Sequence, residues 1–186
     1  MKNGIRLLAV SSGPIYERKK HTTLLVGLVG RLGTIEGVLS EKVAIDGTDA
    51  TSKIIKMFAK SRFKEQIKAI AINGVALAGL NVVDVKALER KTGVPVLVLT
   101  RHRPDKKAFA EALKKYQRID SSADKRMDIV KSLNKERPFL RVGGFYIQCK
   151  KDYAADKAVV ETAFEMLRLA HMIAKGVSTG VSKGRI

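Results

Sequence analysis

The chain has 186 residues, of which 45% are hydrophobic, and this length and composition predict a single globular domain with a substantial core. No apolar run approaches the roughly 20 residues of a membrane-spanning helix, and the first residues lack an apolar stretch of signal-peptide length. The only cysteine, Cys149, fits a reducing compartment. We therefore expect a cytoplasmic protein without membrane association.

The net charge is the unusual property of the composition. Lysine and arginine number 36 against 18 acidic residues, which gives a formal net charge of +18. Because charge of this size repels itself, it favours a polyanionic partner, with nucleic acid (DNA or RNA) ranked first and an anionic membrane surface second. The alternative is that the excess lysine only solvates the surface. Aromatic residues make up only 5% of the chain, which argues against a base-stacking platform.

Short apolar runs separated by turn residues predict three antiparallel strands in the first quarter of the chain, at 7–10, 22–29 and 35–45. Ser11 and Ser12 follow the first run. A helix is expected after the third run, with an apolar stripe and an N-cap at Thr48 or Asp49. Basic side chains gather on this helix and just after it, among them Lys53 and Arg62.

Residues 67–98 predict a strand, a glycine-bearing loop, a helix and a second strand, which is a βαβ unit with parallel strands. Asn73 and Gly74 end its first strand. Gly79 and Asn81 close the loop, Asn81 is the expected N-cap of the helix, and Gly93 is the expected residue at its C-terminal end. Ligands of open α/β sheets bind at the carboxyl ends of strands, so a site is predicted beside Asn73 and Gly74.

The remaining periodicity predicts two helices at about 105–116 and 122–133, an edge hairpin or broken strand at 139–149, and a last helix at 154–173. The whole chain is therefore expected to form an α/β fold with one mixed sheet flanked by helices. Its domain is expected to span 1–175, followed by a basic, flexible tail at 176–186.

Polar residues follow three of the expected strands and could converge in one crevice: Ser11, Ser12, Asp46 and Asn73. The last helix could add Glu165 or His171. Nucleases of this architecture hold Mg²⁺ with several carboxylates, because this hard cation prefers charged oxygen ligands. Of the strand-end residues, only Asp46 carries a carboxylate, so such a site would be deficient. The alternative is that Asp46-Gly47 and Asn73-Gly74 are only turns and that His171 is a core histidine.

Five segments together resemble one protein family over nearly the whole chain: LLAVSSGPI, EGVLSEKVAIDGTDATSKI, SRFKEQIKAIAINGVALAGLNVVDV, TGVPVLVLTRHRPD and LRLAHMIAKGVSTGVSKGR. The sequence resembles domain-of-unknown-function family 99, an uncharacterised, mainly archaeal family that is itself similar to endonuclease V. The resemblance implies a ribonuclease H-like fold, with three antiparallel strands followed by parallel strands.

The resemblance also implies roles for particular residues. Relatives typically carry Asp-Asp where this chain has Ser11-Ser12, and Asp-Gly where it has Asn73-Gly74. Those aspartates look like the metal ligands of endonuclease V. The implied cofactor is Mg²⁺ or Mn²⁺, or none if the neutral residues have abolished the site.

The site residues expected on this basis fall into three sets. The degenerate metal set comprises Asp46, Ser11, Ser12 and Asn73. The catalytic set comprises Asp46, Asn73 and His171, where His171 matches a His or Asp on the last helix of endonuclease V. The nucleic-acid set comprises Gly74, Gly79, Asn81, Lys53 and Arg62.

Three functions follow as hypotheses. The first is an endonuclease V-like protein that binds nucleic acid, with a degenerate metal site and weak or absent cutting. The second is an active Mg²⁺- or Mn²⁺-dependent endonuclease on damaged or structured nucleic acid, which would rely on Asp46, His171 and an outlying carboxylate such as Asp49 or Asp84. The third is a non-catalytic scaffold or assembly partner that uses its basic face.

Overall fold

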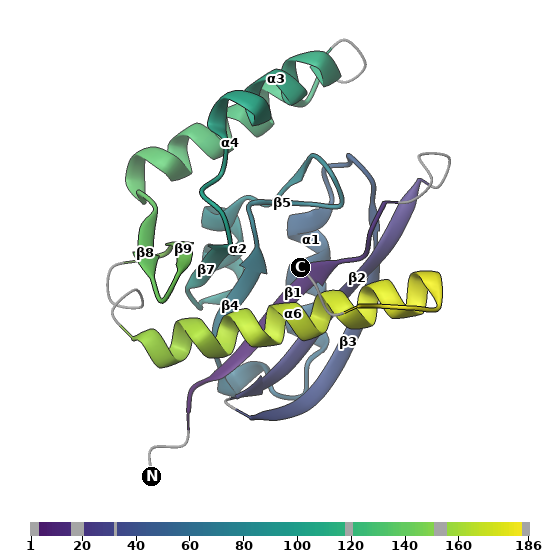
Figure 1. Ribbon diagram of the computed structural model, residues 1–186, viewed down its shortest axis with the longest axis vertical. Coiled ribbons are helices and arrows are strands. Elements are labelled where there is room, and N and C mark those ends of the chain that lie inside the picture. Colours follow the sequence, from purple (N-terminus) through teal and green to yellow (C-terminus); the bar gives the residue numbers. More distant parts are fainter. Residues whose placement is uncertain (1–3, 16–20, 32, 118–120, 151–155, 184–186) are drawn as a thin grey trace.

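The computed structural model describes residues 4–15, 21–31, 33–117, 121–150 and 156–183. Its centre is a seven-stranded sheet of strand order β3-β2-β1-β4-β7-β9-β8 (Figure 1). The strands are β1 (Arg6–Ser12), β2 (Thr22–Arg31), β3 (Thr34–Ala44), β4 (Ile67–Asn73), β7 (Val96–Thr100), β8 (Leu140–Val142) and β9 (Phe145–Gln148). Two short strands, β5 (Ala76–Leu77) and β6 (Asn81–Val82), pair separately.

The direction of the strands confirms the predicted mixed sheet. β1, β2 and β3 pair as an antiparallel meander, whereas β1, β4 and β7 run parallel to one another. The predicted hairpin forms the far edge, where β8 and β9 pair antiparallel. Because β1 and β4 are neighbours in the middle of the sheet, their carboxyl ends lie side by side.

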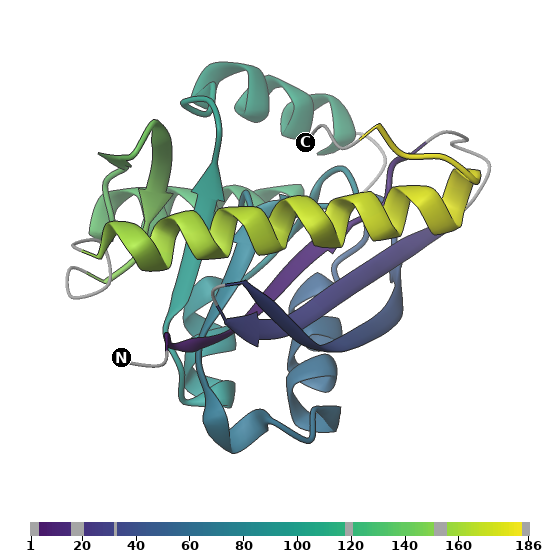
Figure 2. The same cartoon turned by 60° about the horizontal axis from the view of Figure 1, so that its bottom comes forward.

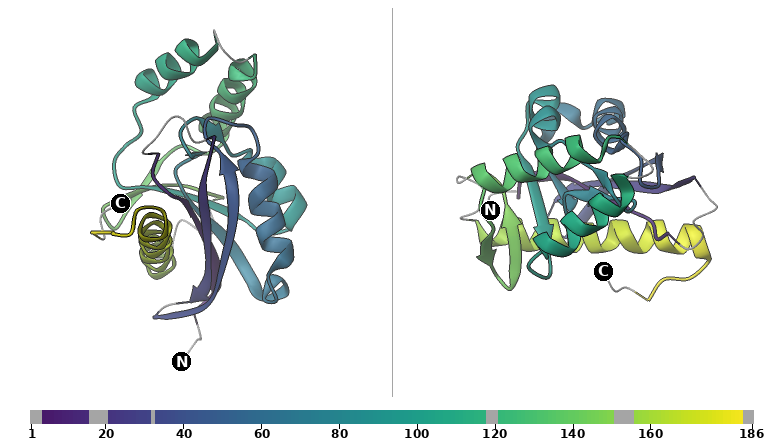
Figure 3. Two further views of the ribbon diagram at one scale, coloured as in Figure 1. Left: turned by 90° about the vertical axis from the view of Figure 1, so that its right-hand side faces the viewer. Right: turned by 90° about the horizontal axis from the view of Figure 1, so that it is seen from above.

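The helices cover both faces of the sheet and its carboxyl-end edge. They are α1 (Ala50–Lys60), α2 (Val85–Thr92), α3 (Lys106–Gln117), α4 (Ala123–Glu136) and α6 (Lys157–Thr179), with a short 3₁₀ turn, η1 (Lys64–Gln66). Helix α6 crosses one face diagonally (Figures 1 and 2), and α1 and α2 pack on the other face (Figure 3). Helices α3 and α4 lie beyond the carboxyl ends of the central strands.

Strand alternation divides the core into two layers. Leu8, Val10, Ile70 and Ile72 belong to the apolar cluster under α1 and α2. Leu7, Ala9, Ala69 and Ala71 belong to the cluster under α6. Burial of β1 and β4 on both faces explains why their sequences are continuous apolar runs rather than alternating ones.

The predicted cap of α2 was wrong. Asn81 belongs to β6, and α2 begins four residues later, where the Asp84 carboxylate accepts a hydrogen bond of 2.9 Å from the backbone N–H of Ala87. Asn81 instead caps α1, because its Oδ1 accepts from the N–H of Ala50 at 3.0 Å. The predicted cap of α1, Asp49, occupies the N-cap position but makes no side-chain cap bond. Gly93 ends α2 in the left-handed conformation (φ 72°), as predicted.

The last helix extends beyond its predicted end. Helix α6 continues to Thr179 and is closed by Gly180 at φ 76°. Residues 176–179, predicted as tail, are therefore helical, and 184–186 lie outside the described residues. The division into a domain at 1–175 and a flexible tail otherwise stays a prediction. Of the helices that the structure describes, none is long and apolar enough to cross a membrane.

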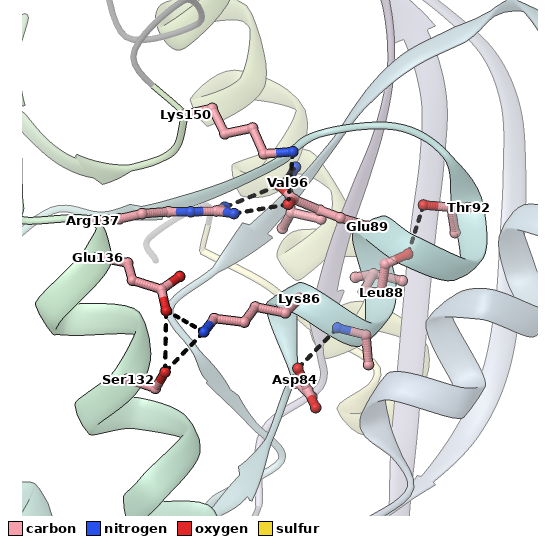
Figure 4. Close-up of polar contacts among 11 residues, drawn as sticks. Asp84, Lys86, Leu88, Glu89, Thr92, Val96, Ser132, Glu136, Arg137 and Lys150 are labelled. Atoms are coloured by element: carbon pink, nitrogen blue, oxygen red, sulfur yellow. Dashed lines mark hydrogen bonds and ion pairs between the residues drawn. The ribbon is translucent and has the colours of Figure 1, made fainter.

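A polar cluster joins α2 to the end of α4 and to the residues after β9 (Figure 4). The Glu89 carboxylate accepts two hydrogen bonds from Arg137, at 2.8 and 2.9 Å, and pairs with Lys150 at 3.3 Å. Burial acts to raise the pKa of Glu89, but the bonds from Arg137 and from the N–H of Val96 outweigh it, so this pKa lies below its usual value. Lys86 also contacts Glu136 and Ser132, which anchors α4 near the carboxyl-end edge.

Candidate functional site

The predicted strand-end residues gather at one edge of the sheet but on two different faces. Val10 of β1 pairs with Ile72 of β4, so Ser11 and Asn73 occupy the next step on neighbouring strands. By alternation both side chains belong to the face under α6, together with Ala9 and Ala71. Ser12 belongs to the opposite face. The structure therefore brings Ser11 and Asn73 together and separates Ser12 from them.

Ser12 is used to hold the loop that follows β4. Its Oγ accepts a hydrogen bond of 3.0 Å from the backbone N–H of Ala78. The carbonyl oxygen of Ala78 in turn accepts from the N–H of Asp46 at 2.9 Å. The ends of β1 and β3 are thus tied to the same loop, which explains how residues distant in sequence meet at this edge.

The Asp46 carboxylate also contacts this loop. Its Oδ1 accepts from the N–H of Leu80 at 2.8 Å. The contact requires glycine at position 79, since a Cβ there would lie 2.1 Å from Asp46 Oδ1 and the backbone has φ +87°. Asp46 itself has φ 54°, a conformation that aspartate adopts more readily than most residues. One carboxylate oxygen of Asp46 is therefore already engaged in shaping the loop.

Arg126, which the sequence analysis did not single out, lies buried against the same loop. From α4 its guanidinium donates to the carbonyl oxygens of Asp46, at 2.8 Å, and of Leu80, at 3.2 Å. The Tyr116 ring lies 5.1 Å from its guanidinium carbon. The signal was present in the sequence, because Arg126 occupies a position on the otherwise apolar stripe of α4 that contains Ala123 and Leu133.

His171 reaches the end of β1 from α6. Its Nδ1 lies 3.2 Å from the carbonyl oxygen of Ser12, and the side chain is half-buried. It therefore stands on the same face as Ser11 and Asn73. Glu165 does not join them, because it is exposed, pairs with Arg168 at 2.9 Å and lines a cavity at the β2–β3 turn. That turn lies at the amino end of β1.

The donor set at this edge does not fit a carboxylate-bound divalent cation. Ser11, Ser12 and Asn73 are neutral, and Asp46 accepts a bond from the loop. The outlying carboxylates are also committed, since Asp49 accepts from the N–H of Ala44 and Asp84 caps α2. Across the described ranges, no group of three or more His, Cys, Asp and Glu side chains is placed to hold a metal ion.

The residues expected to contact nucleic acid do not all lie at the same end of the sheet. Gly74 and Gly79 lie in the loop after β4, and Lys53 lies near the start of α1, at the same end of the sheet. Arg62 lies at the opposite end, where it stacks 4.8 Å from the Phe63 ring that also faces Arg6 of β1. Arg62 therefore cannot share one contact surface with the loop.

Asn81 has a structural rather than a surface role. It is fully buried, and its Nδ2 donates to Ala44 O at 2.9 Å and to Asp49 Oδ1 at 2.7 Å, while its Oδ1 accepts from Ala50. Both amide donors are thus used inside the protein. Because Asn81 is buried, the expectation that it contacts nucleic acid is corrected. Its role is to join the β5–β6 loop to the start of α1.

A second feature of this edge is an apolar pocket of about 450 Å³ beside Gly74. The ends of β4 and β7 form its floor, and α3 and α4 form its walls, with Phe109, Met127 and Phe139 among the lining side chains. The Thr100 hydroxyl is buried here without a hydrogen-bond partner among the described residues. Sequence reasoning missed the pocket because its lining comes from segments far apart in the chain.

Comparison with known proteins identifies the relatives of this chain. The UPF0215 protein of Methanothermobacter thermautotrophicus is 35% identical, with 99% of this chain and 93% of that protein covered. The UPF0215 protein of Thermococcus kodakarensis is 37% identical, with 98% and 97% covered. These relatives confirm the resemblance to an uncharacterised archaeal family.

Solved structures give the same picture of the fold. The crystal structure of an Archaeoglobus fulgidus protein of unknown function matches with a TM-score of 0.78 and 30% identity, covering 93% of this chain and 98% of that one. The catalytic domain of human endonuclease V matches with a TM-score of 0.53 and 10% identity, covering 97% and 86%. The second likeness shows the ribonuclease H-like fold alone. Since the family described as Endonuclease dU matches residues 3–178, this chain belongs to the Endonuclease dU family.

Proposed function

We propose that this protein binds nucleic acid at the carboxyl-end edge of its sheet and that it cuts the bound strand weakly or not at all. The observation that carries the proposal is the neutral pair Ser11 and Asn73, on neighbouring strands of a chain that belongs to an endonuclease family. Membership supports a nucleic-acid partner, and the formal net charge of +18 supports binding to a polyanion.

The loss of carboxylates acts on cutting more than on binding. Phosphoryl transfer with divalent cations needs negatively charged oxygen ligands to hold the metals. Serine and asparagine supply neutral oxygens only. Binding to the phosphate backbone instead depends on cationic side chains, because it is driven largely by the release of counterions. A chain with many basic residues but without these carboxylates is therefore expected to bind nucleic acid and to cut it weakly or not at all.

Fluorescence anisotropy with labelled single-stranded and duplex DNA and RNA, measured between 50 and 300 mM KCl, tests the binding. We expect the logarithm of the binding constant to fall linearly with the logarithm of the salt concentration, as counterion release requires. Binding that does not respond to salt, or no binding at 50 mM KCl, would refute the proposal. The same titration shows which of the four nucleic acids is preferred.

A second candidate is an active Mg²⁺- or Mn²⁺-dependent endonuclease on damaged nucleic acid. The name of the family, Endonuclease dU, favours it and suggests deoxyuridine-containing strands as the first substrate to try. Cutting assays with Mn²⁺ would compare the wild type with Asp46→Ala and His171→Ala. If the wild type cuts and both variants do not, this candidate is established. If all three proteins cut equally, the activity comes from a contaminant.

A further inference from the structure

A second hollow, separate from the apolar pocket, opens at the carboxyl-end edge next to the end of β1. Its volume is about 740 Å³, and it is lined by the segment after β1, the start of β2, the end of β3 and the last turn of α6. Among the described residues that line it, the charged side chains are Lys42, Lys175 and Lys183, and none is acidic. Four hydroxyl-bearing residues also line it: Thr22, Thr23, Ser178 and Thr179.

The end of α6 and the segment after it build one wall of this hollow. Gly180, with φ 76°, ends the helix and reverses the chain, so that the following residues run back beside α6 (Figure 2). The Thr179 hydroxyl lies 2.9 Å from the carbonyl oxygens of both Lys175 and Val181, so its single proton is shared between the helix and the reversed segment. The reversal carries Lys183 to the same hollow as Lys175, which α6 itself supplies.

The lining of the hollow begins shortly after the strand end that carries Ser11 and Ser12. Gly13 follows Ser12 directly, and a Cβ at Gly13 would lie 3.1 Å from Thr23 Oγ1 and 3.3 Å from Ser178 Oγ. The Thr23 hydroxyl donates to the carbonyl oxygen of Pro14 at 3.2 Å. Pro14, the first lining residue after β1, lies two residues beyond Ser12 and is hydrogen-bonded to Thr23 at the start of β2, so one extended ligand could reach from the hollow to the strand end that carries Ser11.

The lysines of the hollow differ from many other lysines of the chain because none of them forms an ion pair with a described acidic side chain. Lys56 and Lys60 share Glu41, and Lys86 pairs with Glu136. Lys150 pairs with Glu89, and Lys157 with Glu161. The structure describes no ion pair for any of the three lysines of the hollow, which are Lys42, Lys175 and Lys183. Their charge is available to an anion.

We infer that this hollow binds the phosphodiester backbone of the nucleic-acid strand and leads it to the end of β1. The inference rests on the proposed function and names the surface that would carry it. Ammonium groups around a hollow attract phosphates as point charges, and neutral hydroxyls can donate to phosphate oxygens. Because these contacts read no base edges, the hollow should hold strands of any sequence.

The size of the effect follows from counterion release. Each contact between a lysine and the phosphate backbone of a single strand contributes about 0.7 to the salt slope. Three contacts therefore contribute about 2 to the slope. By the same relation, the three contacts together strengthen binding about 100-fold at 0.1 M salt.

The test compares two triple variants that remove the same charge from opposite ends of the sheet. The first, Lys42→Gln/Lys175→Gln/Lys183→Gln, removes the charge of the hollow. The control, Lys64→Gln/Lys68→Gln/Lys91→Gln, removes exposed lysines at the amino ends of β4 and β7. A third variant with arginine at all positions of the hollow keeps the charge. Binding of a labelled single strand is measured against KCl, and thermal melts verify that each variant is folded.

We expect the hollow variant to bind about 100-fold more weakly at 0.1 M salt, with a slope smaller by about 2. The control and the arginine variant should stay within about threefold of the wild type. If the wild type binds and the hollow variant equals the control, the inference is overturned while the proposed function stands. If the wild type shows no salt-dependent binding, the proposed function fails, and the inference fails with it.

Discussion

Placing carboxylates at the ends of β1 and β4 should create a site for a divalent cation. Ser11 and Asn73 occupy the same face of adjacent parallel strands, which are about 4.8 Å apart. In the double variant Ser11→Asp/Asn73→Asp, two carboxylates would lie roughly 5 Å from each other. At an effective dielectric constant of about 20, their repulsion amounts to about 3 kcal/mol.

The metal-free double variant should therefore unfold about 6–12 °C below the wild type at pH 7, since a domain of this size loses about 2–4 °C per kcal/mol. A divalent cation placed between the carboxylates removes the repulsion. Mn²⁺ at about 100 times its dissociation constant adds about 2.7 kcal/mol of stability, which should return most of the lost melting temperature. His171, on the same face, is the nearest candidate for a further ligand.

The control for this experiment uses the other serine. In Ser12→Asp/Asn73→Asp the two introduced carboxylates point to opposite faces, so neither a repulsion between them nor a Mn²⁺ site that joins them should appear. A carboxylate at position 12 can still accept the hydrogen bond from Ala78. Thermal melts of both variants and the wild type, in EDTA and in a Mn²⁺ titration, give the comparison. If the Ser11 variant responds to Mn²⁺ no more than the control does, the assignment of the faces is refuted.

Two further predictions concern the stability of the fold, one beside the site and one at the opposite end of the sheet. Replacing the buried Asn81 by Ala should lower the free energy of unfolding by about 3 kcal/mol, because three hydrogen bonds of roughly 1 kcal/mol each are lost. Urea denaturation measures this loss, and the control Asn73→Ala should lose less than about 1 kcal/mol. Equal losses in the two variants would contradict the role of Asn81 as the cap of α1. Glu36 has a pKa lowered to about 2, chiefly by the hydrogen bond from Arg6. Since its folded-state pKa lies below the unfolded value, its stabilising contribution is complete above about pH 4.5 and disappears as the pH falls toward 2. In thermal melts from pH 7 to 2, Glu36→Gln should be less stable than the wild type at neutral pH, and the difference should vanish near pH 2. A difference that stays constant over this range would contradict the assignment of the effect to the Glu36 carboxylate.

Much of the fold could be predicted because local signals and tertiary packing agree. Continuous apolar runs marked β1, β4 and β7 as strands, and Gly93 marked the end of α2. The cap of α2 could not be placed, because Asn81 and Asp84 are both good caps by residue type. Only the tertiary contact of Asn81 with the start of α1 decides between them.

The site was harder to predict than the fold because a strand end has two sides. The sequence shows that polar residues follow three strands, and parallel pairing of β1 and β4 brings their ends together. Which of two consecutive serines faces Asn73 depends on a register that one residue of slippage would invert. The loop after β4 adds a second constraint, because its bonds to Ser12 and Asp46 take up the polar groups of the other face. Ser11, Asn73 and His171 are consequently the positions at which the chemistry of this edge can be changed without dismantling the loop.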